Sequence, residues 1–180
     1  MSSLLLLTLF REQASAGTTE ELLEGAGKAE PEKVLQLIQG GADVNAKNEY
    51  GWTPLMLAAY NNSNLATLTA LLDAGAEVNV KGTDGLTPLM LAARQNSNPE
   101  VLRALMEAGA DVNAKQQDGW TPLMIAAIEN TPEVLTALLE AGADAKAKND
   151  EGKTALDCAR MNEKLKDTPA LKLLEEKTGH

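Results

Sequence analysis

The residue types that catalyse reactions or bind metal are scarce in this sequence. It has one cysteine, Cys158, and one histidine, His180, which is the last residue. These two cannot supply the four ligands, or three ligands and a water, that a zinc site requires. They also leave no nucleophile and base near each other in the sequence, and the glycines do not form a phosphate-binding loop. We therefore expect no catalytic, metal-binding or cofactor-binding residues, and a protein that is not an enzyme.

The charge of the chain narrows the class of partner. Sixteen Lys and Arg stand against 26 Asp and Glu, which gives a net charge of −10. Binding to nucleic acid needs a basic surface that neutralises phosphates, so we expect no nucleic-acid partner and no anionic membrane surface. The acidic excess is explained either by solubility or by electrostatic steering of a basic partner.

Four similar segments recur at a nearly fixed period. Each contains a threonine that begins a short apolar run, and these threonines are Thr53, Thr87, Thr121 and Thr154. Their regular spacing indicates a solenoid of stacked repeats, and the length of the chain corresponds to about five of them. The solenoid is the framework that must position any binding residues.

The residues within one period predict two helices and a hairpin. Thr53 is suited to cap a first helix, because Pro54 then takes the first helical position, where its missing N–H costs nothing. An Asn-rich stretch at 61–64 ends that helix and caps a second one over 65–74. Gly75 follows the second helix, and an extended segment leads to the turn at Asp84-Gly85. In the first unit we expect the two helices at 18–28 and 31–39.

These segments resemble the ankyrin repeat family. The family pattern T-P-L-x-x-A-A, followed by V-x-x-L-L-x-x-G-A, is matched by Thr121-Pro122-Leu123, Ala126-Ala127, Val134, Ala137-Leu138-Leu139 and Gly142-Ala143. The resemblance covers about residues 18–177. It implies a predominantly all-α ankyrin-repeat solenoid of helix-turn-helix units linked by β-hairpin loops, with about five repeats including the caps. The expected units are an N-terminal apolar segment 1–17, a capping repeat 18–47, repeats 48–81, 82–115 and 116–148, and a C-terminal capping repeat 149–180.

The sequence departs from the family pattern at two places. The histidine that usually follows T-P-L is replaced by Met56, Met90 and Met124, and by Asp157 in the last unit. The Gly-His pair between the helices is replaced by polar pairs such as Asn96-Ser97. We expect the methionines to belong to the core, so that apolar packing replaces the hydrogen bonds of the histidine. Cys158 takes the place of Leu57, Leu91 and Ile125, and we expect it to be buried as well.

The resemblance also implies where a partner would bind. Ankyrin proteins usually bind partners on a concave surface formed by hairpin tips and first helices. Trp52, Leu86 and Trp120 are equivalent residues, and on that surface they would form an exposed apolar stripe. The alternative is that each lies half-buried against the next hairpin. Aromatic residues and arginine dominate binding hot spots. The predicted partner-binding residues are Tyr50, Trp52, Tyr60, Leu86, Arg94, Trp120, Ile128 and Glu129.

The favoured function is a non-enzymatic module that binds a protein partner on the concave ankyrin face. The alternative is a structural or self-associating scaffold of engineered origin, in which an apolar helix at Leu4–Phe10 forms a homo-oligomer interface. That segment is too short to span a membrane. It is read as a signal-peptide remnant cut near Ala14–Ala16, as an added helix packed on the first repeat, or as a disordered tail. The expected location is the cytoplasm, or an exported or periplasmic one if the N-terminus derives from a signal peptide.

Overall fold

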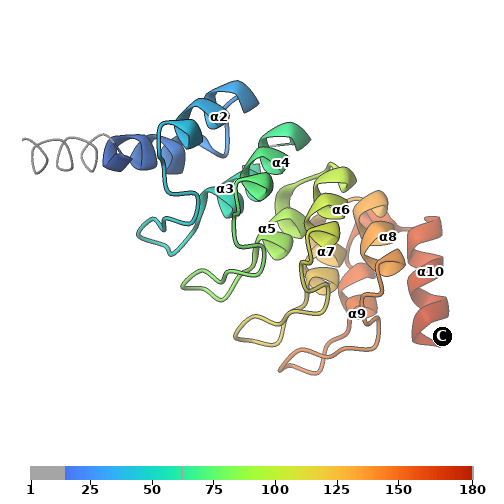
Figure 1. Cartoon of the computed structure of the whole chain (residues 1–180). Helices are drawn as coiled ribbons and strands as arrows, with labels where there is room; N and C mark the ends of the chain where they lie inside the picture. The colour runs from blue at the N-terminus through green and yellow to red at the C-terminus, as the bar shows by residue number, and fades with distance from the viewer. Residues whose placement is uncertain (1–14, 62, 180) are drawn as a thin grey trace, which may run out of the picture.

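The computed structural model describes residues 15–61 and 63–179. The expectations for Leu4–Phe10, and Ala14 of the expected cleavage site, fall outside these residues. The described part is a curved stack of short helices in two layers, with a row of loops projecting from one side (Figure 1). One layer holds α3, α5, α7 and α9, and the other holds α2, α4, α6, α8 and α10. Each helix packs on the next one in its own layer and on its partner in the other.

Most helices begin after a threonine or asparagine, and in most cases a proline follows at the first helical position. After a helical segment at 15–25, the elements are α2 Pro31–Gln39, α3 Pro54–Asn61, α4 Leu65–Asp73, α5 Pro88–Gln95, α6 Pro99–Glu107, α7 Pro122–Glu129, α8 Pro132–Glu140, α9 Ala155–Ala159, the 3-10 helix η1 Glu163–Leu165 and α10 Pro169–Thr178. This all-α repeat solenoid confirms the predicted fold class. The loops have the predicted hairpin shape, but the described residues contain no β-strand.

The threonine caps explain why the inner helices start where they do. The hydroxyl oxygen of Thr87 accepts a hydrogen bond from the Met90 N–H at 3.3 Å, and Thr121 accepts one from Met124 at the same distance. A proline follows each threonine and has no N–H to satisfy. These contacts confirm the cap predicted from the Thr-Pro pairs. A threonine cap contributes about 1 kcal/mol to helix stability.

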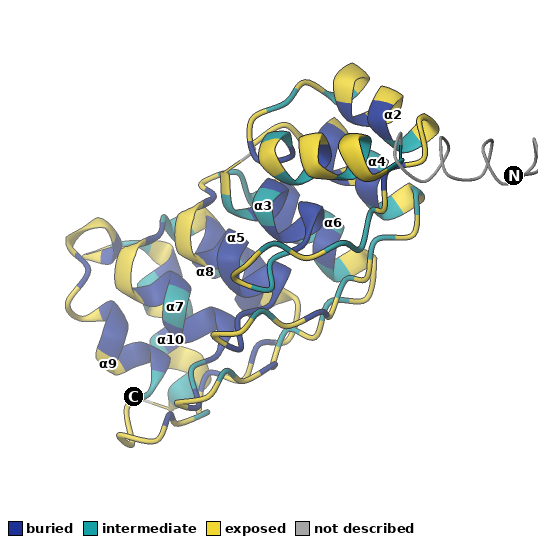
Figure 2. Ribbon diagram, turned by 90° about the vertical axis from the view of Figure 1, so that its left-hand side faces the viewer, coloured by how far each residue is buried: buried dark blue, intermediate teal, exposed yellow. Residues whose placement is uncertain are grey.

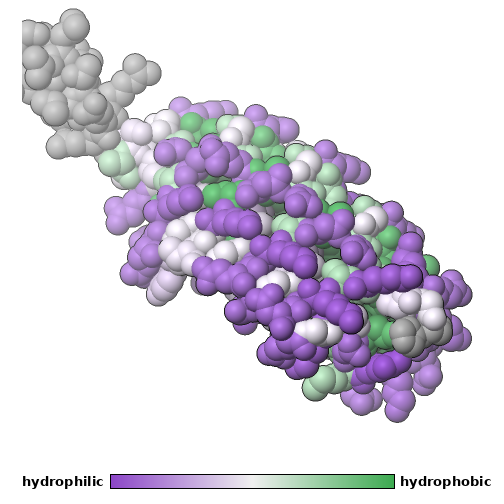
Figure 3. Space-filling view, turned by 90° about the horizontal axis from the view of Figure 1, so that it is seen from below, coloured by the Kyte–Doolittle hydropathy of each residue, from purple (hydrophilic) through white to green (hydrophobic). Residues whose placement is uncertain are grey.

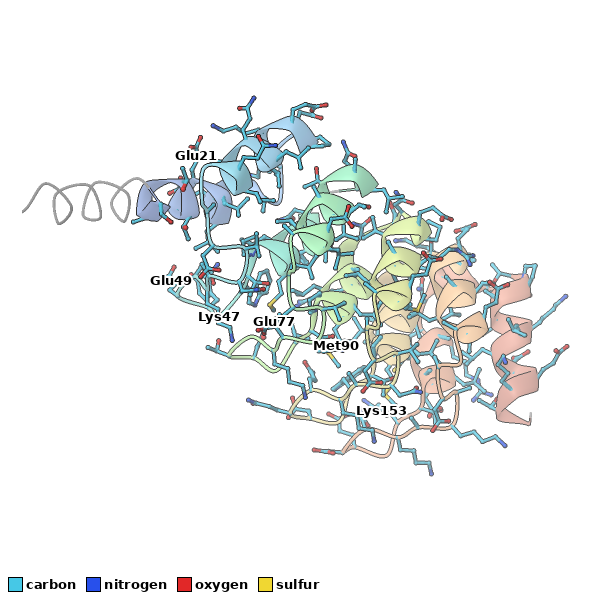
Figure 4. The ribbon with its side chains drawn as sticks, viewed as in Figure 1. Glu21, Lys47, Glu49, Glu77, Met90 and Lys153 are labelled. Carbon is cyan, nitrogen blue, oxygen red and sulfur yellow. The ribbon has the colours of Figure 1, made fainter. Side chains whose placement is uncertain are left out.

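The methionine row lies in the core, as predicted. Met56, Met90 and Met124 are at most 1% exposed. Met56 and Met90 form an apolar cluster with residues from the bases of the hairpins, including Val80 and Leu86. Figure 4 labels Met90 on the side of α5 that faces these loops. The paired alanines of the inner helices are also buried, so the inner layer is enclosed while the outer helices keep one exposed side (Figure 2).

A row of asparagines hydrogen-bonds each repeat to the next at the start of the hairpin loops. The side-chain N–H of Asn45, Asn79 and Asn113 donates to the carbonyl of a glycine in the following repeat, at 3.1, 2.9 and 3.3 Å. The amide oxygen of the same side chain accepts a backbone N–H from the second residue after that glycine. These side chains are only partly shielded from water, so solvent competes for their hydrogen bonds.

A second asparagine row, which the repeat pattern did not predict, is buried in the stack. Asn130 is 5% exposed, and its side-chain nitrogen donates to the carbonyls of Ala93 at 2.7 Å and Asn96 at 3.3 Å. Asn96 and Asn162 make matching bonds to the repeat before them. The expectation that methionine packing alone replaces the family's hydrogen bonds was therefore incomplete. The methionines fill the core, and the asparagines restore the polar link between the repeats.

We expect the substitution Asn130→Ala to lower the free energy of unfolding by about 2–3 kcal/mol. It leaves two buried carbonyls and the partly buried Thr131 N–H without their partner. The matched variant Asn79→Ala also removes one donor and one acceptor, but at an exposed position, and we expect a loss of about 1 kcal/mol. Urea denaturation measures both values. Equal losses would show that burial of the Asn130 amide does not matter.

Candidate protein-binding surface

Five of the eight predicted site residues surround one hollow beside the hairpin loops. The hollow has a volume of about 260 Å³. A second hollow of about 510 Å³ shares Arg94, Ile128 and Glu129 with it and extends to Met161. We call these two hollows together the groove. The residues around the first hollow are Leu86, Arg94, Gln116, Trp120, Ile125, Ile128 and Glu129.

The repeat itself places these side chains together. Arg94 lies in the last turn of α5, and Ile128 and Glu129 lie in the last turn of α7. All three are exposed near the ends of the enclosed inner helices. Trp120 comes from the loop before α7. The turn before it needs Gly119, whose φ of 76° is one that side chains with a Cβ rarely adopt.

The prediction that Trp52, Leu86 and Trp120 form an exposed apolar stripe is wrong. Leu86 is only 6% exposed and packs against Met56 and Met90. The two tryptophans are half-buried. The physical reason is the next hairpin, which covers this position. A Cβ added to Gly82 would lie only 2.9 Å from Cδ1 of Trp52. The alternative, that these residues are half-buried against the next hairpin, describes the two tryptophans, and Leu86 is buried still further.

Trp52 contacts Tyr60 from its own repeat. Their ring centroids are 5.6 Å apart with an interplanar angle of 66°. This edge-on arrangement is favourable for aromatic pairs. The indole N–H of Trp52 is buried and has no hydrogen-bond partner among the described residues. Trp52 and Tyr60 thus pack against each other in the preceding repeat. Neither residue lines the hollow around Trp120.

The remaining predicted residues are accessible. Ile128 is 40% exposed and Tyr50 is 61% exposed, and Arg94 and Glu129 are exposed as well. Lys164 was not among the predicted residues, but it lies in the short helix η1 and lines the groove. Its amine donates to the Glu129 carbonyl at 2.8 Å. No repeat pattern could have indicated it, because η1 lies in the long loop that only the last unit has.

The groove contains both positively and negatively charged side chains, and Arg94 and Glu129 among them are not paired with each other. The ion pairs among the described residues lie elsewhere, between Lys33 and Glu21, Arg103 and two glutamates, and Lys153 and Glu151. Arg94 and Glu129 form no ion pair within the described part of the chain. The side of the molecule that bears the loops is mainly hydrophilic, with apolar side chains visible between charged ones (Figure 3).

Two ionisable groups on α9 have pKa values shifted from their ordinary ones. Burial raises the pKa of the Cys158 thiol, which agrees with the predicted buried position. The raised pKa favours the unreactive protonated form. Hydrogen bonds from the Thr154 N–H and hydroxyl lower the pKa of the Asp157 carboxyl. Among the residues that the structure describes, no His, Cys, Asp or Glu cluster could hold a metal ion. No helix there is long and apolar enough to cross a membrane.

The stacked helix pairs, the threonine caps and the projecting loops define a helical repeat solenoid. The chain belongs to the ankyrin repeat family: a match to "Ankyrin repeats (3 copies)" covers residues 22–116 and 95–178. A human protein described as mitochondrial disaggregase is 51% identical over 43 residues. That match covers 24% of this chain and 6% of the disaggregase, so the chain spans a small part of that relative. Ankyrin repeats generally mediate protein–protein interactions.

Trp52→Ala removes the packing against Tyr60 and the next hairpin. We expect it to lower the free energy of unfolding by about 2 kcal/mol. The control is Tyr50→Ala, which truncates an aromatic residue that is 61% exposed. It should change stability by less than about 0.5 kcal/mol. Chemical denaturation of both variants provides the comparison. A Trp52→Ala variant as stable as the wild type would contradict this packing and favour an exposed position for Trp52.

The Asp157 cap predicts a dependence on pH, because the folded-state pKa is below the unfolded one. The stabilisation is fully present above the ordinary carboxyl pKa of about 3.9 and is lost as the pH falls toward the folded value. Asp157→Asn should therefore be less stable than the wild type at about pH 7, and the difference should narrow below about pH 4. Urea titrations across this pH range measure it. A difference that stays constant down to about pH 3 would contradict the assignment.

Proposed function

We propose that this chain is a non-enzymatic binding module that holds a protein partner in the groove. The observation that supports this most is the convergence of Leu86, Arg94, Trp120, Ile128 and Glu129 around one hollow. These residues come from two neighbouring repeats. Their exposed members are fixed on the last turns of rigid helices, which reduces the entropy lost when a partner binds.

The groove offers a partner both apolar contacts and charged side chains. Ile128 offers an exposed apolar side chain next to half-buried Trp120. This pair suits an apolar anchor of a partner. Arg94 and Glu129 lie at the same hollow and can pair with charges of opposite sign on the partner. Such pairs at the rim contribute more to specificity and association rate than to affinity. Trp52 and Tyr60 keep the preceding repeat in place.

The similarity to the disaggregase is not a reason to propose an enzymatic activity for this chain. It spans 43 residues, which is a small part of that protein. The residues around the first hollow include no Ser, Thr, Cys or His, so this hollow lacks the nucleophile and base of a catalytic triad. The scaffold alternative depends on Leu4–Phe10, outside the described residues, and it remains a prediction.

The proposal is tested by capturing proteins from a cell lysate with the immobilised chain and with two variants. Ile128→Asp places a charge in the groove and should reduce specific capture at least about tenfold, because an apolar contact becomes a buried charge. Leu35→Asp is the matched control, since Leu35 is 43% exposed on α2 and Ile128 is 40% exposed. It should capture as well as the wild type.

Circular dichroism must first show that both variants fold as the wild type does. If the same proteins bind Ile128→Asp and the wild type equally, the groove is not the binding surface. If capture is lost with Leu35→Asp alone, the partner binds the outer helices.

A further inference from the structure

The last hairpin loop has an uncovered side where the earlier loops are covered. A Cβ added to Gly51, Gly85 or Gly119 would lie 3.0, 3.4 or 2.8 Å from an atom of the following loop. At the equivalent Gly152, no described atom lies within 4 Å of that position. The last loop lies beside α9 at one end of the row of loops (Figure 1), and Figure 4 labels Lys153 on it.

The contacts that join the earlier loops show what this uncovered side offers. The Lys81 amine donates to the Lys115 carbonyl at 3.1 Å, and the Lys115 amine donates to the Lys148 carbonyl at 3.2 Å. Lys148 continues this row, but its amine makes no hydrogen bond within the described residues. A backbone bond of 3.1 Å also joins the Asp150 N–H to the Asp118 carbonyl. The carbonyl equivalent to that of Asp118 in the last loop belongs to Glu151.

A basic hollow borders the uncovered side. It measures about 320 Å³. We call it the terminal slot, and its residues are Lys146, Lys148, Gly152, Thr154, Leu156, Asp157, Arg160 and Thr178. Three of these side chains are cationic and one is anionic. The carboxylate of Asp157 accepts hydrogen bonds from Thr154 and offsets one of the three positive charges, so the slot keeps an excess of two positive charges.

The terminal slot differs in charge from the rest of the chain. Residues 144–180 hold 8 of the 16 Lys and Arg and 8 of the 26 Asp and Glu, so the whole net charge of −10 belongs to residues 1–143. A second copy of the chain is therefore a poor occupant, because two such copies repel each other. A local anionic group on another protein has no such obstacle at the slot.

The chain itself shows which shape fits against a hairpin side of this kind. The loop that covers Gly119 presents Asp150, whose carboxylate oxygen and N–H both approach that glycine. At the earlier glycines Gly51 and Gly85, the covering residues are the uncharged Thr83 and Gln117, so Asp150 is the acidic example of this packing. An incoming acidic turn thus repeats the arrangement that the structure contains at Gly119.

We propose that the terminal slot binds an acidic reverse turn of a partner protein. A carboxylate of that turn pairs with Lys148 and Arg160, and one of its backbone N–H groups donates to the Glu151 carbonyl. This site is separate from the groove around Ile128 and does not depend on the function proposed for it. It allows two partner segments to bind the chain at once.

The test is an NMR titration of the isotope-labelled full chain with two cyclised hairpin peptides. One carries the turn Asn-Asp-Glu-Gly and the other the uncharged turn Asn-Asn-Gln-Gly. The acidic peptide should shift the amide signals of Gly152 and Thr154, with a dissociation constant of about 1 mM or tighter. The uncharged peptide should bind about tenfold more weakly, because it lacks the carboxylates that pair with the slot.

Three variants locate the site. Lys148→Glu should weaken binding of the acidic peptide at least about tenfold. Lys172→Glu changes a lysine on α10 that is also exposed and should bind as the wild type does, and so should Ile128→Asp in the groove. Unchanged spectra outside the slot show that each variant is folded. Equal binding of the two peptides, shifts spread evenly over surface lysines, or full binding by Lys148→Glu would each overturn the proposal.

Discussion

The contact between one repeat and the next is the constraint on which the rest of the structure depends. The helices α2 to α10 are short, with none longer than α10. Helices of that length are not stable alone in water. They persist because apolar faces are stacked and because asparagine side chains join the backbones of successive repeats. The buried amides of Asn96, Asn130 and Asn162 matter most here, since they bond to carbonyls near the ends of inner helices. Such carbonyls have no partner within their own helix, and water does not reach them here.

The same stacking decides which residues remain available for a partner. Each hairpin covers the residue that precedes the Thr-Pro pair of the previous repeat, so Leu86 becomes part of the core and Trp52 becomes half-buried. The last turn of each inner helix is not covered in this way. Arg94 and Ile128 therefore stay accessible, whereas Met90 and Met124, one helical turn or more before them, are enclosed. A buried structural surface and an accessible surface thus arise from one short segment.

The repeat pattern predicted where α3 to α10 begin, because each of these starts has its own local signal, a threonine or asparagine followed in most cases by proline. It placed the first helix at 18–28, whereas the described helical segment spans 15–25, where no Thr-Pro or Asn-Pro pair occurs. It also predicted the burial of the methionines. It did not predict the burial of Leu86, because that depends on how closely the following loop approaches. The buried asparagines could have been found, since Asn96 and Asn130 recur at the repeat period. Lys164 could not, because the helix η1 that positions it has no counterpart in the other units.

The central claim is that the groove at the ends of α5 and α7 is the surface that holds a protein partner. Hydrogen exchange of the chain, measured with and without a partner isolated by capture, tests it most directly. Binding in the groove should slow exchange in the peptides that cover residues 116–130 and the end of α5, and should leave the outer helices α4 and α6 unchanged. Protection of α4 and α6 with unchanged exchange at 116–130 would contradict the claim.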